Sequence, residues 1–290
     1  MNQTIKKIEQ AVDFAIRKHE TSDKDAYTIG NYTYECYMSN AMWETFVEEM
    51  KKNYPQHYER YASGVGKELV EKNNIPPKMA SYGSSSRFVY KTLRDVANIE
   101  FEKDCPKRFA RGWNPQLDAY VKVGETSIFV EAKCHEIYND KHLGSKSYEK
   151  VYNCVGNGFK YDEMTSVISC NGTEIRHIEA KQLICHLLAI AAAILEGRCE
   201  PKVRLVYLIF NPTREDVAIH VHDEWKGMVE EVYKQAISEM KCICKLEGLF
   251  DNIYKFQKGN LSKKGLVKYS GKPTFELCVA DQESWESFFK

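Results

Sequence analysis

The stretch Leu117-Asp-Ala-Tyr-Val-Lys-Val123, then Gly124-Glu125, then Thr126-Ser-Ile-Phe-Val-Glu-Ala-Lys-Cys134 has the pattern of a β-hairpin. Both halves are rich in β-branched and aromatic residues, and a two-residue segment with glycine fits the turn between them. Successive strand side chains point to opposite faces, so Glu131 and Lys133 share a face that Ala132 does not. In a paired hairpin, Asp118 near the start of the first strand lies beside Glu131 near the end of the second.

The carboxylates of Asp118 and Glu131, brought together in this way, predict a metal site. Carboxylate oxygens are the ligands that Mg²⁺ prefers, and Mn²⁺ can substitute for it. A metal held there could polarise a phosphoryl oxygen and lower the pKa of a bound water. Lys133 could orient that water and offset the charge that grows on the phosphate. The hairpin therefore predicts hydrolysis of a phosphodiester by a metal-activated water.

The Glu-x-Lys pattern is not specific by itself. It recurs at five other places in the chain: Glu49, Glu179, Glu200, Glu224 and Glu239. Four of these lie in helical patterns, where residues two apart do not share a face, and Glu200 precedes a proline. Only Glu131-Ala-Lys133 ends a β-run that follows an Asp-bearing strand. The alternative interpretation is a half-exposed hairpin with a polar face.

The rest of the chain alternates between helical and strand periods. An α/β (α+β) fold is expected, with a central mixed β-sheet flanked by helices. The predicted organisation is a helical N-terminal extension, residues 1–60, packed on a domain of residues 61–290. Apolar spacing predicts helices over 3–19, 38–53, 87–96, 174–196 and 222–246. Strands are predicted over 203–210, 253–257 and 274–279.

Composition restricts the class of protein without naming it. Forty-one basic residues balance forty-one acidic ones, so net charge neither indicates nor excludes a nucleic-acid partner. Ten cysteines are scattered along the chain, and no signal-peptide pattern opens it, which favours a reduced cytoplasmic protein. Cys242 and Cys244 lack zinc spacing and are interpreted as core or surface thiols. The longest apolar stretch, Leu183 to Leu195, is shorter than the roughly 20 residues that span a bilayer, so no membrane is expected.

Two blocks carry a family resemblance. Pro115–Val121 and Ile128–Glu136 look like the active-site hairpin of the PD-(D/E)XK superfamily. The block Pro76–Phe88, with Gly64-x-Gly66-x-Glu68 before it, resembles a family of bacterial restriction endonucleases. The resemblance implies a restriction-endonuclease-like core, a divalent metal and DNA as substrate. A homodimer is expected by analogy, because cutting two strands usually needs two sites, and a restriction role would bring a cognate methyltransferase as partner.

The resemblance also implies further site residues. The backbone carbonyl of Ala132 and a third carboxylate complete the metal ligands in such sites; Glu68 is the first choice for the carboxylate and Glu102 the second. Gln182 would be the catalytic glutamine near the lysine. His186 lies four residues on, hence on the same helix face. Surface glutamates, a boundary glutamine and a core histidine are the alternative interpretations.

Substrate contacts are predicted at His186 and at three more residues. His135 is expected to share the face of Glu131 and Lys133. Ser86 and Arg87 open a predicted helix, and helix N-termini bind phosphate. Simple capping and a strand end are the alternatives.

The sequence thus favours a Mg²⁺-dependent DNA endonuclease in restriction or another defence role. The competing hypothesis is a non-catalytic nucleic-acid-binding module with the same fold. A cysteine nucleophile at Cys134-His135 is disfavoured, because adjacent strand residues point to opposite faces.

Overall fold

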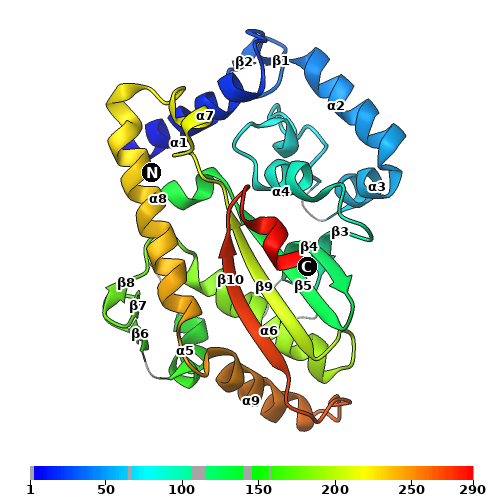
Figure 1. Cartoon of the computed structure of the whole chain (residues 1–290), viewed down its shortest axis with the longest axis vertical. Coiled ribbons are helices and arrows are strands. Elements are labelled where there is room, and N and C mark those ends of the chain that lie inside the picture. Colours follow the sequence, from blue (N-terminus) through cyan, green and yellow to red (C-terminus); the bar gives the residue numbers. More distant parts are fainter. Residues whose placement is uncertain (1–2, 65–66, 106–114, 140–145, 157, 290) are drawn as a thin grey trace.

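A mixed five-stranded sheet forms the centre of the molecule (Figure 1). The computed structural model describes residues 3–64, 67–105, 115–139, 146–156 and 158–289. The strands β5 (Thr126–Lys133), β9 (Lys202–Ile209) and β10 (Thr274–Ala280) are parallel, and antiparallel β4 and β3 complete the order β10-β9-β5-β4-β3. The bounds of these last two are Gln116–Val123 for β4 and Glu100–Asp104 for β3. This confirms an α/β architecture with a central mixed sheet flanked by helices.

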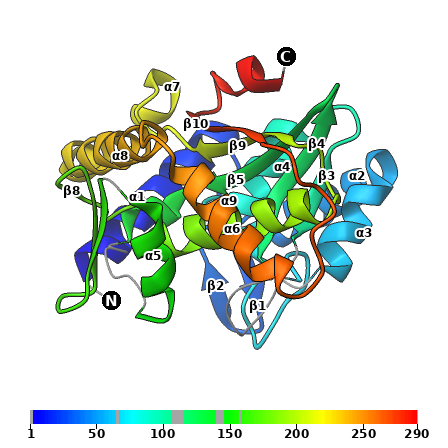
Figure 2. The same ribbon diagram turned by 90° about the horizontal axis from the view of Figure 1, so that it is seen from below.

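One face of the sheet is covered by the helices α6 (Ala180–Leu195) and α9 (Leu249–Ser262), and α5 (Glu149–Val155) packs beside them on α9 (Figure 2). Nearly all of α6 is buried, as its continuous apolar sequence requires. Phe250 of α9 stacks on Phe275 of β10, with ring centroids 4.0 Å apart. The crossover from β5 through α6 to β9 gives the sheet its parallel part.

The long helix α8 (Asp223–Cys244) runs beside the sheet and packs on β10 (Figure 1). A second, three-stranded antiparallel sheet lies against α8. Its strands are β6 (Phe159–Asp162), β7 (Val167–Cys170) and β8 (Thr173–Glu174).

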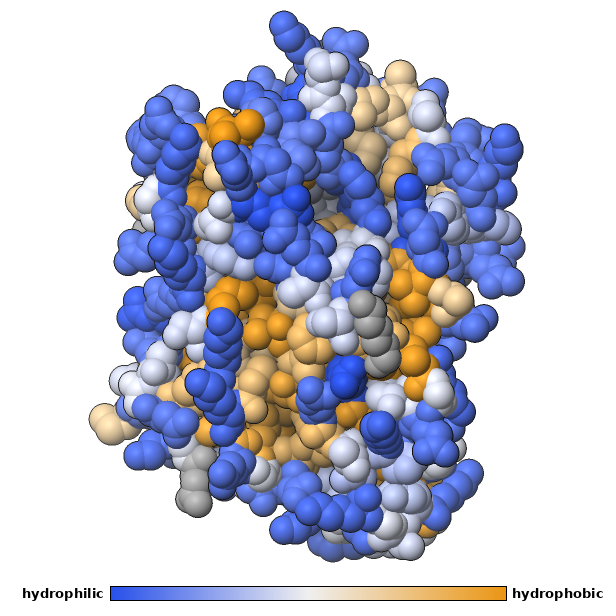
Figure 3. All heavy atoms as spheres, viewed as in Figure 1, coloured by the Kyte–Doolittle hydropathy of each residue, from blue (hydrophilic) through white to orange (hydrophobic). Residues whose placement is uncertain are grey.

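The other face of the main sheet carries α4 (Ser85–Leu93) and the C-terminal 3₁₀ turn η4 (Trp285–Phe289). Phe88 of α4 meets Phe210 edge-on, and the Arg204 guanidinium of β9 lies over the Phe288 ring. Figure 3 views this face and shows apolar side chains gathered over its lower half, bordered by polar ones.

The N-terminal elements lie across the end of the sheet at which β5 and β9 finish (Figure 1). They are α1 (Gln3–Glu20), β1 (Tyr27–Ile29), β2 (Tyr32–Tyr34), α2 (Asn40–Asn53), α3 (Pro55–Ser63) and the 3₁₀ turn η1 (Lys78–Ala80). Residue 60 falls inside α3. Apolar residues from Ile8 of α1 to Ala280 of β10 form one continuous core, so the N-terminal helices share the core of the sheet.

Several elements of the structure differ from those predicted. The strand expected over 253–257 is wrong, because these residues lie in α9 and bury Ile253, Gln257 and Leu261 at helical spacing. The helix expected from residue 174 begins at Ala180, because the chain before it first completes β8. The sequence patterns also gave no sign of β3 or α3. The remaining connections are short turns: η2 (His135–Tyr138), η3 (Lys146–Tyr148) and α7 (Glu215–Ala218).

Among the described residues, no helix is both long and apolar enough to cross a membrane.

Candidate active site

Strand register brings three carboxylates into one row. Ala119 of β4 pairs with Val130 of β5 and with Phe101 of β3. One step along the strands, Asp118 therefore lies between Glu131 of β5 and Glu102 of β3. Glu131 in turn pairs with Tyr207 of β9. The row of carboxylates runs across the three adjoining strands β3, β4 and β5, with Tyr207 of β9 next to it, near the end of the sheet that faces the N-terminal elements.

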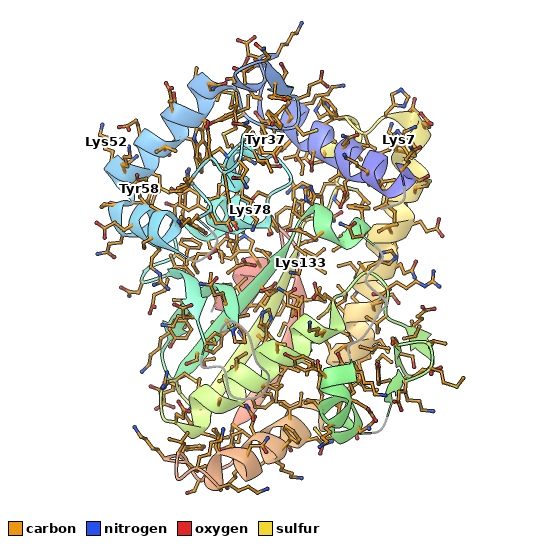
Figure 4. All side chains as sticks on the ribbon, turned by 180° about the vertical axis from the view of Figure 1, so that it is seen from behind. Lys7, Tyr37, Lys52, Tyr58, Lys78 and Lys133 are labelled. Carbon is orange, nitrogen blue, oxygen red and sulfur yellow. The ribbon has the colours of Figure 1, made fainter. Side chains whose placement is uncertain are left out.

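Lys133 makes the central contacts of the site. Its Nζ lies 2.5 Å from Glu131 Oε1 and donates a hydrogen bond of 2.8 Å to Gln182 Oε1 of α6. Burial alone would lower the pKa of Lys133, but the charges of Glu131, Glu136 and Asp118 raise it above its usual value. Lys133 is therefore a fixed cation. Figure 4 shows it in the middle of the rear view.

Asp118 is held against the peptide group of its neighbouring strand. Its Oδ2 accepts a 2.6 Å hydrogen bond from the N–H of Ala132. Burial, and then the negative charge of Glu131, raise the pKa of Asp118 well above its usual value. Burial also raises the pKa of Glu131, against the opposing effect of Lys133. The two carboxylates are close enough to repel each other, as the predicted hairpin requires.

Glu102, next to Asp118, has an unusual backbone conformation. Its φ is +51° within β3, in the left-handed region that residues with a side chain rarely adopt. Arg60 of α3 donates hydrogen bonds to the carbonyls of Phe101 and Glu102 and so supports this conformation. Burial, then Asp118 and Glu68, raise the pKa of Glu102 to about 8. Strained residues of this kind concentrate at functional sites.

Glu68 approaches the same region from the loop after α3. Its carboxylate is buried and pairs with Lys78 Nζ at 2.9 Å through Oε1, while Oε2 is buried without a hydrogen-bond partner in the described structure. The block that contains it comes close to Glu102, since a Cβ on Gly64 would lie 3.8 Å from Glu102 Oε2. Gly66 lies outside the described residues. Both candidates for the third carboxylate therefore lie in the neighbourhood of Asp118.

Gln182 and His186 face the hairpin together, as their spacing predicts. His186 Nε2 lies 3.7 Å from Glu131 Oε2, too far for a hydrogen bond. Burial, and then the charge of Lys133, lower the pKa of His186 to about 3. His186 is thus a neutral, buried histidine beside Glu131, and Gln182 is the residue that touches the lysine.

His135 does not share the face of Glu131 and Lys133, and that prediction is wrong. The strand ends at Lys133, and His135 begins η2. Its Nδ1 lies 2.9 Å from Asp13 Oδ1 of α1. Burial lowers its pKa, but the hydrogen bond and charge of Asp13 raise it more, to about 9. His135 therefore connects the end of the hairpin to α1.

Ser86 and Arg87 are buried, and the contacts found for them are with other residues of the protein. Ser84 is the N-cap of α4 and accepts from the N–H of Arg87, which is the simple capping alternative. The Arg87 guanidinium pairs with Glu20 of α1 and lies over the Tyr82 ring, 5.0 Å from its centroid. Ser86 accepts a hydrogen bond from Tyr61 through its carbonyl.

Three residues next to the site were not predicted from the sequence patterns. Tyr207 looked like one more apolar residue of a central strand, yet its hydroxyl is buried without a partner in the described structure, and burial and then Glu131 raise its pKa. Glu136 accepts from the N–H of Cys134 and influences the pKa of Lys133. Lys78 lies in the segment Pro76–Phe88 and pairs with Glu68. Strand parity could have found Tyr207, but Lys78 and Glu136 depend on loops.

The carboxylate oxygens of the site are of the kind that a hard cation binds, but the side chains are not arranged around a common metal position. In the described ranges, no three His, Cys, Asp or Glu side chains are arranged to hold a metal ion. The geometry explains this, since Glu131 is turned toward Lys133 and Asp118 toward Ala132. The raised pKa values of Glu102, Asp118 and Glu131 nevertheless indicate an excess of carboxylate for the charge present.

Comparison with protein-family models, with curated proteins and with solved structures gives no match for this chain. The family resemblance therefore stays a prediction, and function must be argued from the site itself.

Proposed function

We propose that this protein is a divalent-metal-dependent endonuclease that hydrolyses DNA phosphodiester bonds. The observation that carries the proposal is the register of Glu102, Asp118 and Glu131 in adjoining strands, beside a Lys133 held by Glu131 and Gln182. Buried carboxylates that raise one another's pKa need a compensating cation. Three or four carboxylates with one lysine form a site of the kind that hydrolyses phosphodiesters.

In this proposal Asp118 and Glu131 hold Mg²⁺ or Mn²⁺, with the Ala132 carbonyl and Glu68 or Glu102 completing the ligands. Such an ion polarises a phosphoryl oxygen and acidifies a bound water. Lys133 holds its proton firmly, so its part is to position the attacking water and offset phosphate charge rather than to act as a base. Gln182 fixes the Lys133 ammonium through its amide oxygen.

The proposal includes a restriction-endonuclease-like core for the central sheet, and a role in restriction or another defence against foreign DNA. The antiparallel β3-β4-β5 unit followed by the α6 crossover to β9 supports it. A homodimer and a cognate methyltransferase belong to the same proposal, as does a cytoplasmic location.

The test is DNA cleavage by purified protein with Mg²⁺ or Mn²⁺. We expect Asp118→Asn and Lys133→Met to reduce the cleavage rate at least about 10³-fold, because each removes a group that acts on the transition state. Matched controls lie at the other end of the same hairpin. Glu125→Gln and Lys122→Met change exposed residues at or near the turn and should leave the rate unchanged.

Full cleavage in folded Asp118→Asn or Lys133→Met protein would contradict the assignment. Failure of wild-type protein to cleave, with DNA still bound, would favour the non-catalytic nucleic-acid-binding module. The existing Glu131–Lys133 ion pair is the observation that keeps this second function in view, because it can neutralise Glu131 without a metal.

A further inference from the structure

Two thiols meet where the small sheet touches the long helix. Cys170 ends β7 and is fully buried, while Cys242 lies in the last turn of α8 and is half-buried. Their Sγ atoms are 2.6 Å apart, although 72 positions separate them in the chain. That separation is about 0.5 Å longer than a disulfide bond and is closer than two unbonded thiols remain at rest.

The surroundings hold the two sulfurs in place. Cys242 Sγ also lies 3.3 Å from the carbonyl oxygen of Cys170, and the Asn171 side-chain amide approaches it to 3.9 Å. Cys244 lies on the same helix, but two residues correspond to a turn of about 200°, so it faces a different direction. The pair Cys170–Cys242 is therefore selected by the packing of β7 on α8.

An oxidant has access to one member of the pair. Cys242 lines an open groove of about 550 Å³ together with Lys241 and Lys245. Burial raises the pKa of the Cys170 thiol, which makes Cys170 the slower nucleophile. The accessible Cys242 is thus suited to react first, and the buried Cys170 to resolve the product.

We propose that Cys170 and Cys242 form a reversible disulfide that links β7 to α8 when the protein reacts with hydrogen peroxide. The Cys242 thiolate attacks one peroxide oxygen, the O–O bond breaks, and hydroxide leaves with Cys242 as a sulfenic acid. The Cys170 thiol then attacks the Cys242 sulfur, and the S–O bond breaks to release water. Two thiols lose two electrons, and the peroxide is reduced to two water molecules.

The disulfide would add a second link between α8 and the segment that connects β7 to α6. Glu239 of α8 already provides the first. Glu239, three residues before Cys242, accepts hydrogen bonds from the N–H groups of His177 and Ile178 at 2.9 and 3.1 Å. These residues lead into α6. The disulfide would thus fix both ends of the segment between β7 and α6 to one face of α8. This inference does not rest on the proposed function.

The experiment treats the full-length protein with hydrogen peroxide, blocks the remaining thiols with N-ethylmaleimide and maps the peptides by mass spectrometry. We expect the titratable thiols of the denatured chain to fall from ten to eight, with one cross-linked pair, Cys170–Cys242. Dithiothreitol should restore all ten. The oxidised protein should also unfold at a higher temperature than the reduced one, because the cross-link closes a long loop.

Single substitutions distinguish a cross-link through Cys242 from one through the neighbouring Cys244. Cys244→Ser should leave the cross-link intact, whereas Cys242→Ser should leave Cys170 open to alkylation once the chain is denatured. Peptide mapping of wild-type protein decides the matter even if a variant folds poorly. Alkylation of both Cys170 and Cys242 after peroxide treatment, or a cross-link that uses Cys244, would overturn the proposal.

Discussion

At the scale of single residues, Glu102 shows how strain and charge coincide in this molecule. A left-handed backbone and a buried carboxylate with a pKa of about 8 are each unfavourable, and both fall on one residue next to Asp118. Arg60 donates hydrogen bonds to the backbone, and its charge, like that of Lys78, lowers the pKa of the Glu102 carboxylate less than burial and the neighbouring carboxylates raise it. We interpret Glu102 as a residue that serves the candidate site rather than stability.

Glu20 is the opposite case, a carboxylate whose negative charge is compensated by neighbouring positive charges. Burial raises its pKa, but Arg87 and then Lys91 lower it more, to below its ordinary value of 4.5. Replacing Glu20 with glutamine leaves the buried Arg87 without its counter-charge. We expect the free energy of unfolding to fall by about 3 kcal/mol at neutral pH, measured by denaturant unfolding.

The pH dependence follows from the sign of the shift. A lowered pKa stabilises the folded protein above pH 4.5, and this contribution is lost as the pH falls through the folded-state pKa. The difference between wild type and Glu20→Gln should therefore shrink in acid. The control is Glu48→Gln, since Glu48 forms an exposed pair with Lys51 and should change stability by about 0.5 kcal/mol or less. Equal effects of the two substitutions would contradict this description of Glu20.

Which site residues the sequence could predict depends on periodicity. Strand alternation placed Glu131 and Lys133 together, and helical spacing placed Gln182 and His186 on one face. His135 was misplaced because β5 ends one residue earlier than the pattern suggested. The partner of Arg87 could not be foreseen, because Glu20 is distant in sequence and only tertiary packing brings the two together.

At the scale of elements, α6 depends on α8 for its position. The two N–H groups that precede α6 donate to Glu239, which is fully buried. Replacing Glu239 with leucine leaves both groups without an acceptor, so we expect a loss of about 2–4 kcal/mol in the free energy of unfolding. Faster amide exchange at His177 and Ile178 should accompany it. Leucine at the exposed Glu230 of the same helix is the control.

If Glu239→Leu left the exchange of these amides unchanged, α6 would have to be positioned by its own packing alone.

Element prediction succeeded where one period ran without interruption. The hairpin, α6, α8 and β9 are of this kind. It failed for α9, where the short run Ile253–Gln257 is equally compatible with a strand and a helix, and for β3, which carries the strained Glu102. Such short segments take their structure from the sheet and helices around them.

At the scale of the whole molecule, one core joins the N-terminal helices to the sheet. Lys133, which contacts the carboxylate row through Glu131, lies where they meet (Figure 4). The chain has no net charge, so the excess of negative charge is local. The α/β class could be predicted because helix and strand patterns alternate along the chain. The arrangement of the N-terminal elements around Glu68 could not, because it depends on contacts between distant segments.

The central claim is that this row of carboxylates binds a divalent cation, and calorimetric titration of the full-length protein with Mn²⁺ tests it most directly. We predict saturable binding that is lost in Asp118→Asn and in Glu131→Gln and retained in Glu125→Gln. Because the Asp118 substitution also removes a buried charge that its neighbours oppose, the metal-free Asp118→Asn protein should unfold at a temperature no lower than wild type. Equal Mn²⁺ binding by wild type and the folded Asp118→Asn and Glu131→Gln proteins, or no binding by any of them, would contradict the account.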